Sequence, residues 1–482
     1  MKKKIVIYWA RRDLRMRDNP ALFAAVAFSK KENIDFLPIF ILEEYMTNGL
    51  ENYQFGYPSR FFLINALPIF AQNFKNFNVF HGKAAKIIKS ISDIYDITVF
   101  VNEDVYSDFY TQIKKIRDDD ISIKLYSDAL TISKETKTGS GNIYSVFTPF
   151  KNTVWDHFIN SDVLAKPNMS ELPLFKDKIL QQKVINCDNK NLQKIFSNKK
   201  SFQIGKKIID IDNLINVKND YSDWYFSEED AVKIFDSFLK NKINKYKIDR
   251  DVLSLEGTSK MSLALAWGLV SSRFLTKKIL KNKDADSEGS THFISELIWR
   301  EFYKYLSFHK PELMNIEFQQ KFRGKIEWVD DKTAKHRFEK WIKGETGYPI
   351  VDAAMMQLAK TGYMHNRARM IVASVLTKNF GVDWRWGQEY FRAMLIDLDE
   401  SSNNGGWQWG ASVGADQKPI RIFNPYLQAE NYDKDKIYQK KYLTEDYFEN
   451  PPSLLIEHKK AREGALQRYG LSEGRDGYAR DY

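Results

Sequence analysis

Cysteine is nearly absent from this chain. Cys187 is the only one among 482 residues, which excludes an intramolecular disulfide and an iron–sulfur cluster ligated by cysteine alone. Long apolar runs are also missing. The run near the start extends only from Ile5 to Ala10, too short for a secretory signal, and no stretch of about 18 apolar residues could span a membrane. We therefore expect a cytoplasmic protein.

Several familiar catalytic signatures are missing too. No GxGxxG follows the first apolar run, so a Rossmann-type dinucleotide site is not expected in the first third of the chain. The seven histidines show no metal-ligand spacing, and no Ser/His/Asp arrangement is evident. We expect neither a metal site nor hydrolytic chemistry.

The chain is instead rich in positive charge and in aromatic residues. Its net charge of +10 suits a polyanionic partner such as nucleic acid, although lysines in the Lys/Asn-rich segments are equally consistent with a solvated surface. The aromatic content of 14% and hydrophobic content of 43% are typical of an ordered globular protein. Eight of the eleven tryptophans lie between Trp267 and Trp409, so one region concentrates the indoles.

The chain divides into three regions. In the first, residues 1–135, short apolar runs alternate with helical patterns such as Ala84–Ile94, which predicts an α/β domain with a doubly wound parallel sheet. Residues 136–220 are rich in Asn, Lys and Ser and are interpreted as a long connector on the surface. From residue 221 to 482 only helical periodicity remains, which predicts an all-α domain. The runs expected as strands are Ile5–Trp9, Asp35–Leu42, Asn78–Phe80, Ile97–Val101 and Ile121–Tyr126.

A predicted helix over Ile294–Leu306 carries a mixed face. Glu296, Trp299, Arg300 and Tyr303 recur at helical spacing beside an apolar stripe. A solvated face is one explanation. A pocket wall is the other, because pocket walls commonly combine an acid, a guanidinium and aromatic rings.

A second predicted helix, Tyr363–Leu376, places Asn366, Arg369 and Met370 on one face. An amide, a guanidinium and a thioether suit the edges and the ring of a planar heteroaromatic ligand. The alternative is a partly solvated face with Met370 in the core.

Hydroxyl groups precede a third helical run, within Glu256–Leu269. Thr258, Ser259 and Ser262 could bind a phosphate together with unpaired N–H groups of the helix start. Plain N-capping by Thr258 or Ser259 is the alternative. Upstream side chains that could reach the same anion are Tyr246 and Arg250.

Two acids and two tryptophans occupy the stretch "DLDESSNNGGWQWGASVGAD". Its small and polar residues are typical of a loop, and we expect the "NNGG" segment to be a tight turn. Asp397 and Asp399 are either solvated loop acids or buried carboxylates, and a buried one needs a partner such as Arg369.

These segments coincide with the motifs of one family. "YWARRDLRMRDNPAL", "ELIWREFY", "TGYPIVDAAM", "YMHNRARM" and "DLDESSNNGGWQWGASVGAD…RIFNP" resemble, in order, the motifs of the DNA photolyase/cryptochrome family. The resemblance extends from residue 4 to about residue 462, where "EHKKAR" also fits, and is closest to class I cyclobutane pyrimidine dimer photolyases. It implies an α/β domain, a connector and a helical domain that holds FAD.

The resemblance also implies which side chains hold FAD. Arg369 and Asp397 would form an ion pair beside the isoalloxazine, with Asp399 near the same ring edge. Asn403 would face flavin N5, where an amide suits reduced flavin and favours repair over signalling. The residues that match phosphate and ribitol contacts are Tyr246, Thr258, Ser259 and Ser262.

Electron-transfer and DNA contacts follow from the same motifs. Glu296 matches the acid that hydrogen-bonds the base edge of the flipped dimer and stabilises its radical anion. Asn366 and Met370 match substrate contacts, and (6-4) photolyases carry histidines at these two positions. The electron-transfer chain corresponds to Trp407, Trp384 and Trp328, the indoles packed on the dimer to Trp409 and Trp299, and the phosphate contacts to Arg250, Arg367 and Arg421.

The implied activity is light-driven repair of cyclobutane pyrimidine dimers in DNA. Excited reduced FAD would donate an electron to a flipped-out dimer, making the protein a carbon–carbon lyase that works as a monomer. A cryptochrome-like blue-light photoreceptor is the main alternative, and a flavin-dependent nucleic-acid-binding protein without repair activity is another.

Some positions depart from the family pattern. "VNEDVYSDF" lacks the expected folate-contact pair, so folate, deazaflavin and flavin all remain open as a second, antenna chromophore. Gly410 and Val413 alter the segment that leads to Arg421, and Tyr363 stands where tryptophan is more usual.

Overall fold

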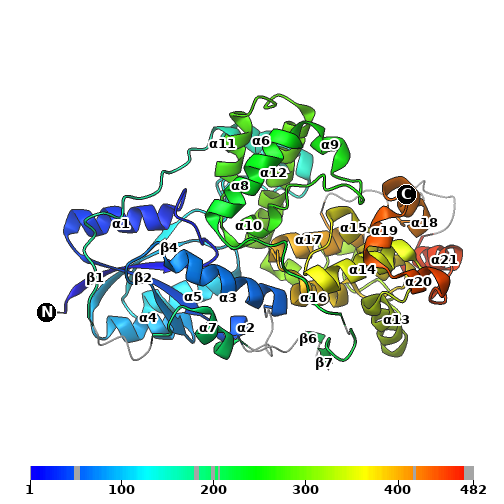
Figure 1. Cartoon of the computed structure of the whole chain (residues 1–482), viewed down its shortest axis with the longest axis horizontal. Helices are drawn as coiled ribbons and strands as arrows, with labels where there is room; N and C mark the ends of the chain where they lie inside the picture. Colours follow the sequence, from blue (N-terminus) through cyan, green and yellow to red (C-terminus); the bar gives the residue numbers. More distant parts are fainter. Residues whose placement is uncertain are drawn as a thin grey trace.

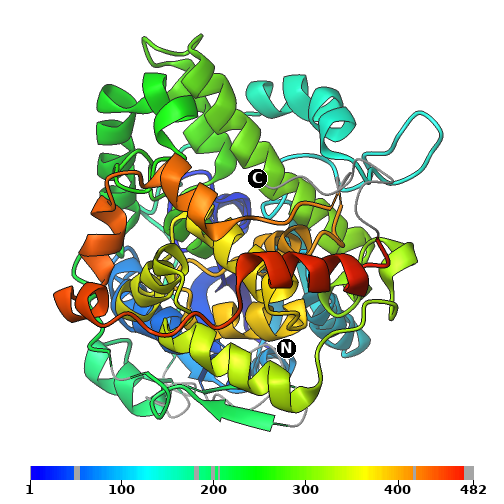
Figure 2. The same ribbon diagram turned by 90° about the vertical axis from the view of Figure 1, so that its right-hand side faces the viewer.

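The structure is a computed structural model. It describes residues 2–47, 55–177, 184–196, 201–204, 207–215, 217–415 and 420–471. Figure 1 shows an α/β layer at one end of the molecule and a large group of helices at the other. In Figure 2, which faces the helical end, helix α21 (His458–Arg468) lies across the front.

The first region forms a five-stranded, fully parallel sheet in the order β3-β2-β1-β4-β5. The central strand β1 is buried at all of its residues but the first, as expected for a strand covered on both faces. Alternate residues of β1 enter different cores: Val6 and Tyr8 pack with helix α1, and Ile5 and Ile7 pack with helices α4 and α5. The doubly wound prediction is confirmed. Its elements are β1 (Lys4–Ala10), α1 (Pro20–Glu32), β2 (Asp35–Leu42), α2 (Glu44–Thr47), α3 (Tyr57–Ala71), β3 (Asn78–His81), α4 (Ala84–Ser92), β4 (Asp96–Asn102), α5 (Ser107–Asp118) and β5 (Ser122–Tyr126).

The segment interpreted as a connector has secondary structure of its own. Helix α6 (Phe147–Asn160) buries Phe150 and Val154 and packs against helix α12. Further along, isolated β-bridges join Leu174 to β2 and Ile185 to β3. Helix α7 (Asn189–Ile195) and an antiparallel hairpin of β6 (Ser201–Ile204) and β7 (Lys207–Asp210) complete it.

Beyond residue 221 the described residues form helices and no strand element, as predicted. None of the helices in the described part of the chain is long and apolar enough to cross a bilayer. Short 3-10 turns and one π-helical turn, Val375–Asn379, join them. The α-helices are α8 (Glu228–Asn241), α9 (Tyr246–Asp249), α10 (Ser262–Trp267), α11 (Ser272–Leu280), α12 (Glu288–His309), α13 (Asp331–Lys343), α14 (Pro349–Thr361), α15 (Asn366–Ser374), α16 (Trp384–Met394), α17 (Glu400–Gly410), α18 (Pro425–Tyr432), α19 (Ile437–Tyr442), α20 (Glu445–Glu449) and α21.

The "NNGG" segment is not a turn, and here the prediction was wrong. It lies inside helix α17, whose N-cap Asp399 accepts a hydrogen bond from the Ser402 N–H. Gly405 is required because a Cβ there would come within 2.2 Å of the Tyr303 ring. Asn404 is buried and donates to the Leu313 carbonyl and to Gln388. Tertiary packing therefore overrides the low helix propensity of asparagine and glycine.

Candidate functional site

The predicted site residues converge on four helices of the second half. Helix α17 packs against α12, α15 and α16, and these four carry most of the side chains singled out from the sequence. Two distinct places result: one around the Arg369–Asp397 ion pair, and a cavity at the edge of the sheet, which contains Asp399.

The expected ion pair is present. Arg369 Nη2 lies 2.8 Å from Asp397 Oδ2 and 3.0 Å from Oδ1, and the Asp397 side chain is fully buried. Arg369 Nε also donates to the Met364 carbonyl at 2.7 Å, and its guanidinium lies 5.3 Å from the centre of the Tyr363 ring. The reading of Asp397 as a solvated loop acid is therefore wrong. The pair leaves a guanidinium partly exposed beside a tyrosine ring, an arrangement that suits the polar edge of a planar ligand.

Asn403 and Trp407 present buried polar atoms without a protein partner. Asn403 Nδ2 donates to the Gln388 carbonyl at 3.1 Å, but neither Asn403 Oδ1 nor Trp407 Nε1 has a hydrogen-bond partner among the described residues. Leaving such an atom unpaired costs about 1–3 kcal/mol, so a ligand with its own hydrogen-bonding groups fits here. An amide oxygen facing the protonated N5 of a reduced flavin meets this requirement, so Asn403 fits FAD.

The hydroxyl residues ahead of α10 do not occupy the N-cap position of that helix. The N-cap residue is Met261, which makes no side-chain cap, while Ser259 Oγ accepts from the Met261 N–H at 3.2 Å. Ser262, the first residue of the helix, is exposed. Capping of the helix start by Thr258 or Ser259 is thus not observed. Tyr246, on α9, is buried, and burial raises the pKa of its hydroxyl, which stays protonated as a donor.

Glu296 and Arg250 form an ion pair that the sequence did not predict. Arg250 Nη1 lies 2.5 Å from Glu296 Oε1 and 2.7 Å from His292 Nε2. The Arg250 side chain is only 11% exposed, and its pair with the carboxylate orients Glu296; the phosphate contact expected of Arg250 stays a prediction. Burial, then Arg250, lower the pKa of His292, which keeps this imidazole neutral. His292 was missed, although it precedes Glu296 by one helical turn.

Trp299 stacks face to face on a residue of the connector. The Trp299 and Phe147 rings have centroids 3.6 Å apart and planes 8° apart, and Tyr303 lies 5.6 Å away on the same helix. Phe147 belongs to a segment read as surface connector, and the sequence carried no signal that it reaches this site. Trp409 is half-buried and makes an edge contact with Phe423 at 6.2 Å.

The remaining DNA candidates lie on more open surface. On α15 the exposed Asn366 has its Nδ2 3.9 Å from the sulfur of Met370, so the two side chains form one small face. Met370 is half-buried and packs against the hydrophobic core, as the alternative interpretation had it. Arg367 is held by Asp251 at 3.0 Å and lies over the Tyr432 ring. Arg421 is exposed, and its carbonyl accepts a hydrogen bond from the buried Lys378.

The three tryptophans proposed for electron transfer are arranged around α16. The Trp407 ring lies on this helix where Gly387 leaves room, since a Cβ there would be 2.1 Å from the indole. Trp384 begins the helix and is fully buried. Trp328 is half-buried, and the neighbouring Val329 N–H donates to the Gly381 carbonyl just before α16. Their assignment to one electron-transfer chain stays a prediction.

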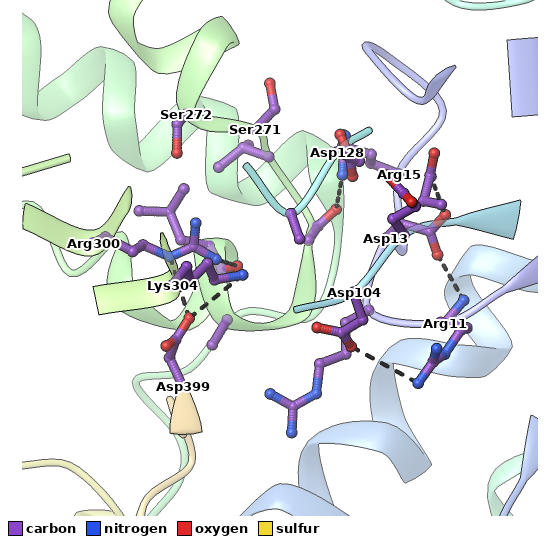
Figure 3. A pocket seen from close by; sticks show the side chains of 18 of the residues that line it. Arg11, Asp13, Arg15, Asp104, Asp128, Ser271, Ser272, Arg300, Lys304 and Asp399 are labelled. Atoms are coloured by element: carbon purple, nitrogen blue, oxygen red, sulfur yellow. Dashed lines mark hydrogen bonds and ion pairs between the residues drawn. The ribbon is translucent and has the colours of Figure 1, made fainter. Parts of the chain in front are cut away.

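Asp399 lies in a separate cavity between the sheet and α12. Its carboxylate is 3.4 Å from Arg300 Nε and 3.8 Å from Lys304 Nζ, and these three residues line the cavity with Asp104 and Arg11 (Figure 3). Burial opposes ionisation, but Lys304 and Arg300 outweigh it and lower the pKa of Asp399 to about 2. Asp399 thus lies beside two cations, and its expected place near the isoalloxazine edge stays a prediction.

This cavity is at the carboxyl edge of the parallel sheet. Its lining includes Asp13 after β1, Asn102 at the end of β4 and Asp128 after β5. At this edge the chain leaves β1 toward β2 on one side and leaves β4 toward β5 on the other, and open α/β sheets bind ligands at such a divergence. No group of three or more His, Cys, Asp or Glu side chains in the described residues could hold a metal ion.

Comparison with known proteins decides the family. Residues 6–169 match the family model described as DNA photolyase, and residues 293–480 match the FAD binding domain of DNA photolyase. The deoxyribodipyrimidine photo-lyase of Alkalihalophilus pseudofirmus is 32% identical over 94% of this chain and 91% of its own length. The chain belongs to the DNA photolyase family.

Two solved photolyases share the whole fold. A bacterial class III photolyase from Agrobacterium tumefaciens has a TM-score of 0.77 at 30% identity, with 98% of each chain covered. An archaeal photolyase from Sulfolobus tokodaii, solved with two FAD molecules, has a TM-score of 0.77 at 25% identity and covers 97% of this chain and 99% of its own. The resemblance inferred from the motifs is therefore confirmed at family level, and so are the α/β plus helical architecture and the FAD-binding domain of this photolyase. Its placement in class I stays a prediction.

Proposed function

We propose that this photolyase repairs cyclobutane pyrimidine dimers in DNA under light. One observation carries the proposal: the exposed Asn366 and the half-buried Met370 form one face of α15, the helix whose Arg369 holds the buried Asp397. A lesion docked on that face would lie next to the polar edge of the flavin. An amide and a thioether, rather than two imidazoles, face it, which favours the cyclobutane lesion over the (6-4) lesion.

Each residue has a defined task in this proposal. Bound reduced FAD supplies the light-driven electron that opens the cyclobutane ring and is then returned. Arg369 and Asp397 fix the flavin edge, and the unpaired Asn403 oxygen accepts a hydrogen bond from it. Glu296, oriented by Arg250, would accept a hydrogen bond from the base edge of the flipped dimer.

The DNA phosphates and bases are bound by the open side of the site. Trp299 and Trp409 give apolar surfaces against which an extruded dimer stacks. The phosphate contacts would come from Arg250, Arg367 and the exposed Arg421. The bound protein acts as a cytoplasmic monomer in this proposal.

The direct test is repair of an oligonucleotide that contains one thymine cyclobutane dimer. Reduced, purified protein is illuminated, and a (6-4) lesion is treated in parallel. Loss of the cyclobutane dimer only in light, with the (6-4) lesion untouched, supports the proposal. Absence of repair with FAD bound and photoreducible would favour the photoreceptor alternative.

We propose also that the cavity at the sheet edge holds a second chromophore. Support comes from its position at the carboxyl ends of β1, β4 and β5, and from the two FAD molecules in the archaeal relative. Denaturing the purified protein and identifying the released fluorophores tests this. A single equivalent of FAD and no second chromophore, after supplementation with folate, deazaflavin and flavin, would contradict it.

A further inference from the structure

Trp407 has two buried tryptophans as neighbours, and they lead in different directions. The Trp341 ring on α13 lies 6.0 Å from the Trp407 ring, centre to centre, with the planes 71° apart. Trp384 is on α16, one helical turn before Gly387, where the Trp407 indole rests. Both neighbours are fully buried. Contact alone therefore does not decide which of them supplies an electron to Trp407.

The two neighbours differ in what meets the indole N–H. Trp384 Nε1 donates to Glu317 Oε1 at 3.3 Å, and the Glu317 side chain is only 5% exposed. Trp341 Nε1 has no hydrogen-bond partner in the described part of the chain. The rings around Trp341 are those of Phe338, Tyr390, Phe391 and Trp407.

An indole that has lost an electron carries a positive charge, so its surroundings decide how easily it is oxidised. In a low-dielectric interior an isolated charge is costly, and a carboxylate a few ångströms away offsets much of that cost. Trp384 has such a carboxylate on its N–H, whereas Trp341 is enclosed by neutral aromatic rings.

One positive charge opposes this effect. The Arg385 guanidinium lies 4.8 Å from the centre of the Trp384 ring and pairs with Glu317 at 2.8 Å. Arg385 also pairs with Asp383 at 2.8 Å. Two carboxylates and one guanidinium therefore surround Trp384, which leaves a formal charge of −1 beside it.

We propose that Glu317 is a positioning residue that directs electron supply to Trp407 through Trp384 and away from Trp341. This rests on the proposed function as a photolyase and on the electron-transfer chain that the family motifs assign to Trp407, Trp384 and Trp328. Light drives one electron from Trp407 to oxidised flavin, Trp384 refills Trp407, and Trp328 refills Trp384. The oxidised Trp328 releases its indole proton to water, and an external thiol then returns an electron and a proton to it and becomes a thiyl radical. The net result is one electron transferred from a thiol to the flavin.

The test compares Glu317→Gln with three other variants in protein loaded with oxidised FAD. Glutamine keeps the size and an oxygen acceptor but removes the negative charge. The matched control is Glu339→Gln, which removes one carboxylate from α13, the helix that carries Trp341. Trp341→Phe and Trp384→Phe each remove one of the two tryptophans that could supply an electron to Trp407. Glu317→Asp keeps the charge and serves as the second variant if Glu317→Gln does not fold.

Two readouts are needed. The yield of long-lived tryptophan radical after a flash should fall about tenfold in Glu317→Gln, equivalent to about 1.4 kcal/mol, and stay at the parent level in Glu339→Gln and Trp341→Phe. Glu317→Asp should give an intermediate yield. Independently of flavin chemistry, the ¹⁵N–¹H signal of the Trp384 indole should move in Glu317→Gln while that of Trp341 stays in place.

The outcomes separate this inference from the function it rests on. Normal radical yield in Trp384→Phe would overturn the proposed electron chain itself. Loss of yield in Trp384→Phe with parent-like yield in Glu317→Gln would leave the chain standing and overturn the role of Glu317. If the radical yield fell as far in Trp341→Phe as in Trp384→Phe, the claim that electrons reach Trp407 through Trp384 rather than Trp341 would be overturned.

Discussion

Trp299 and Phe147 stack with ring centroids 3.6 Å apart and planes only 8° from parallel. One ring belongs to the long helix α12 and the other to the first turn of α6, in the segment between the two domains. One face of the proposed lesion-binding indole is thereby fixed by a residue more than a hundred positions earlier in the chain. The orientation of Trp299 depends on that contact.

Phe147→Leu should weaken binding of lesion-containing DNA. Leucine keeps the apolar volume but removes the aromatic stack that orients Trp299, so we expect a loss of about 1 kcal/mol, roughly fivefold in Kd. FAD content should not change, because the Phe147 ring packs on Trp299 and Phe302, neither of which is assigned to the flavin. The Kd is measured by titrating each protein with DNA that contains one dimer and with the same DNA undamaged. An equal loss of affinity for both DNAs would mean that Phe147 affects general DNA binding instead.

Glu296→Gln should lower the repair yield while FAD stays bound. The amide cannot stabilise a charge on the dimer in the same way, and Arg250 loses its closest carboxylate. The matched control is Glu288→Gln on the same helix, whose side chain is 81% exposed. Repair per absorbed photon and FAD content are measured together. Parent-level repair in Glu296→Gln, or loss of flavin from it, would show that the assigned role is wrong.

Arg369→Gln should destabilise the protein and release flavin. It leaves the fully buried Asp397 carboxylate without its cation, and breaking a buried pair from one side costs about 3–5 kcal/mol, less here because Arg369 is 26% exposed. The double variant Arg369→Gln/Asp397→Asn should recover part of the stability, since no unpaired charge remains. Thermal unfolding measures the stability of both variants, and the FAD-to-protein ratio measures the release of flavin. If the single and double variants were equally stable, the buried Asp397 charge would not be the cause of the destabilisation.

Trp328→Phe should block photoreduction of oxidised FAD and spare repair by chemically reduced protein. Trp328 is half-buried, and in the proposed series of three tryptophans it is the one that receives the electron from outside the protein. Trp386→Phe is the matched control, because Trp386 lies on α16 two residues after Trp384 but packs on Phe338 of α13. Photobleaching of the flavin absorption in the presence of a thiol is the measurement. Equal photoreduction in Trp328→Phe and the parent would reject the assignment.

Asp399 should contribute stability that disappears in acid. Its folded-state pKa of about 2 lies below the value of about 3.9 expected in the unfolded chain, so the contribution is present above pH 4 and is lost as the pH falls toward 2. Asp399→Asn keeps the helix cap of α17 and removes the charge. The difference in unfolding free energy between parent and variant, about 2 kcal/mol at neutral pH, should shrink through that window. A difference independent of pH would mean that Lys304 and Arg300 do not hold the carboxylate ionised.

The sequence by itself determined the architecture and the chemical inventory. Strands covered on both faces are nearly continuously apolar, which made β1, β2 and β4 readable, and all five predicted runs occur in the parallel sheet. The predicted helix over Ile294–Leu306 lies within α12 because its apolar stripe repeats at helical spacing. The family motifs named Arg369 and Asp397, and these two residues do pair.

Only the tertiary structure decided how these groups meet. Asparagines and glycines that read locally as a turn form α17, because burying Asn404 and fitting Tyr303 against Gly405 outweigh propensity. Asp399 faces Lys304, Glu296 holds Arg250, and Glu317 meets the Trp384 N–H, each across many intervening residues. Pairings of this kind depend on packing between elements, and no local pattern of residues encodes them.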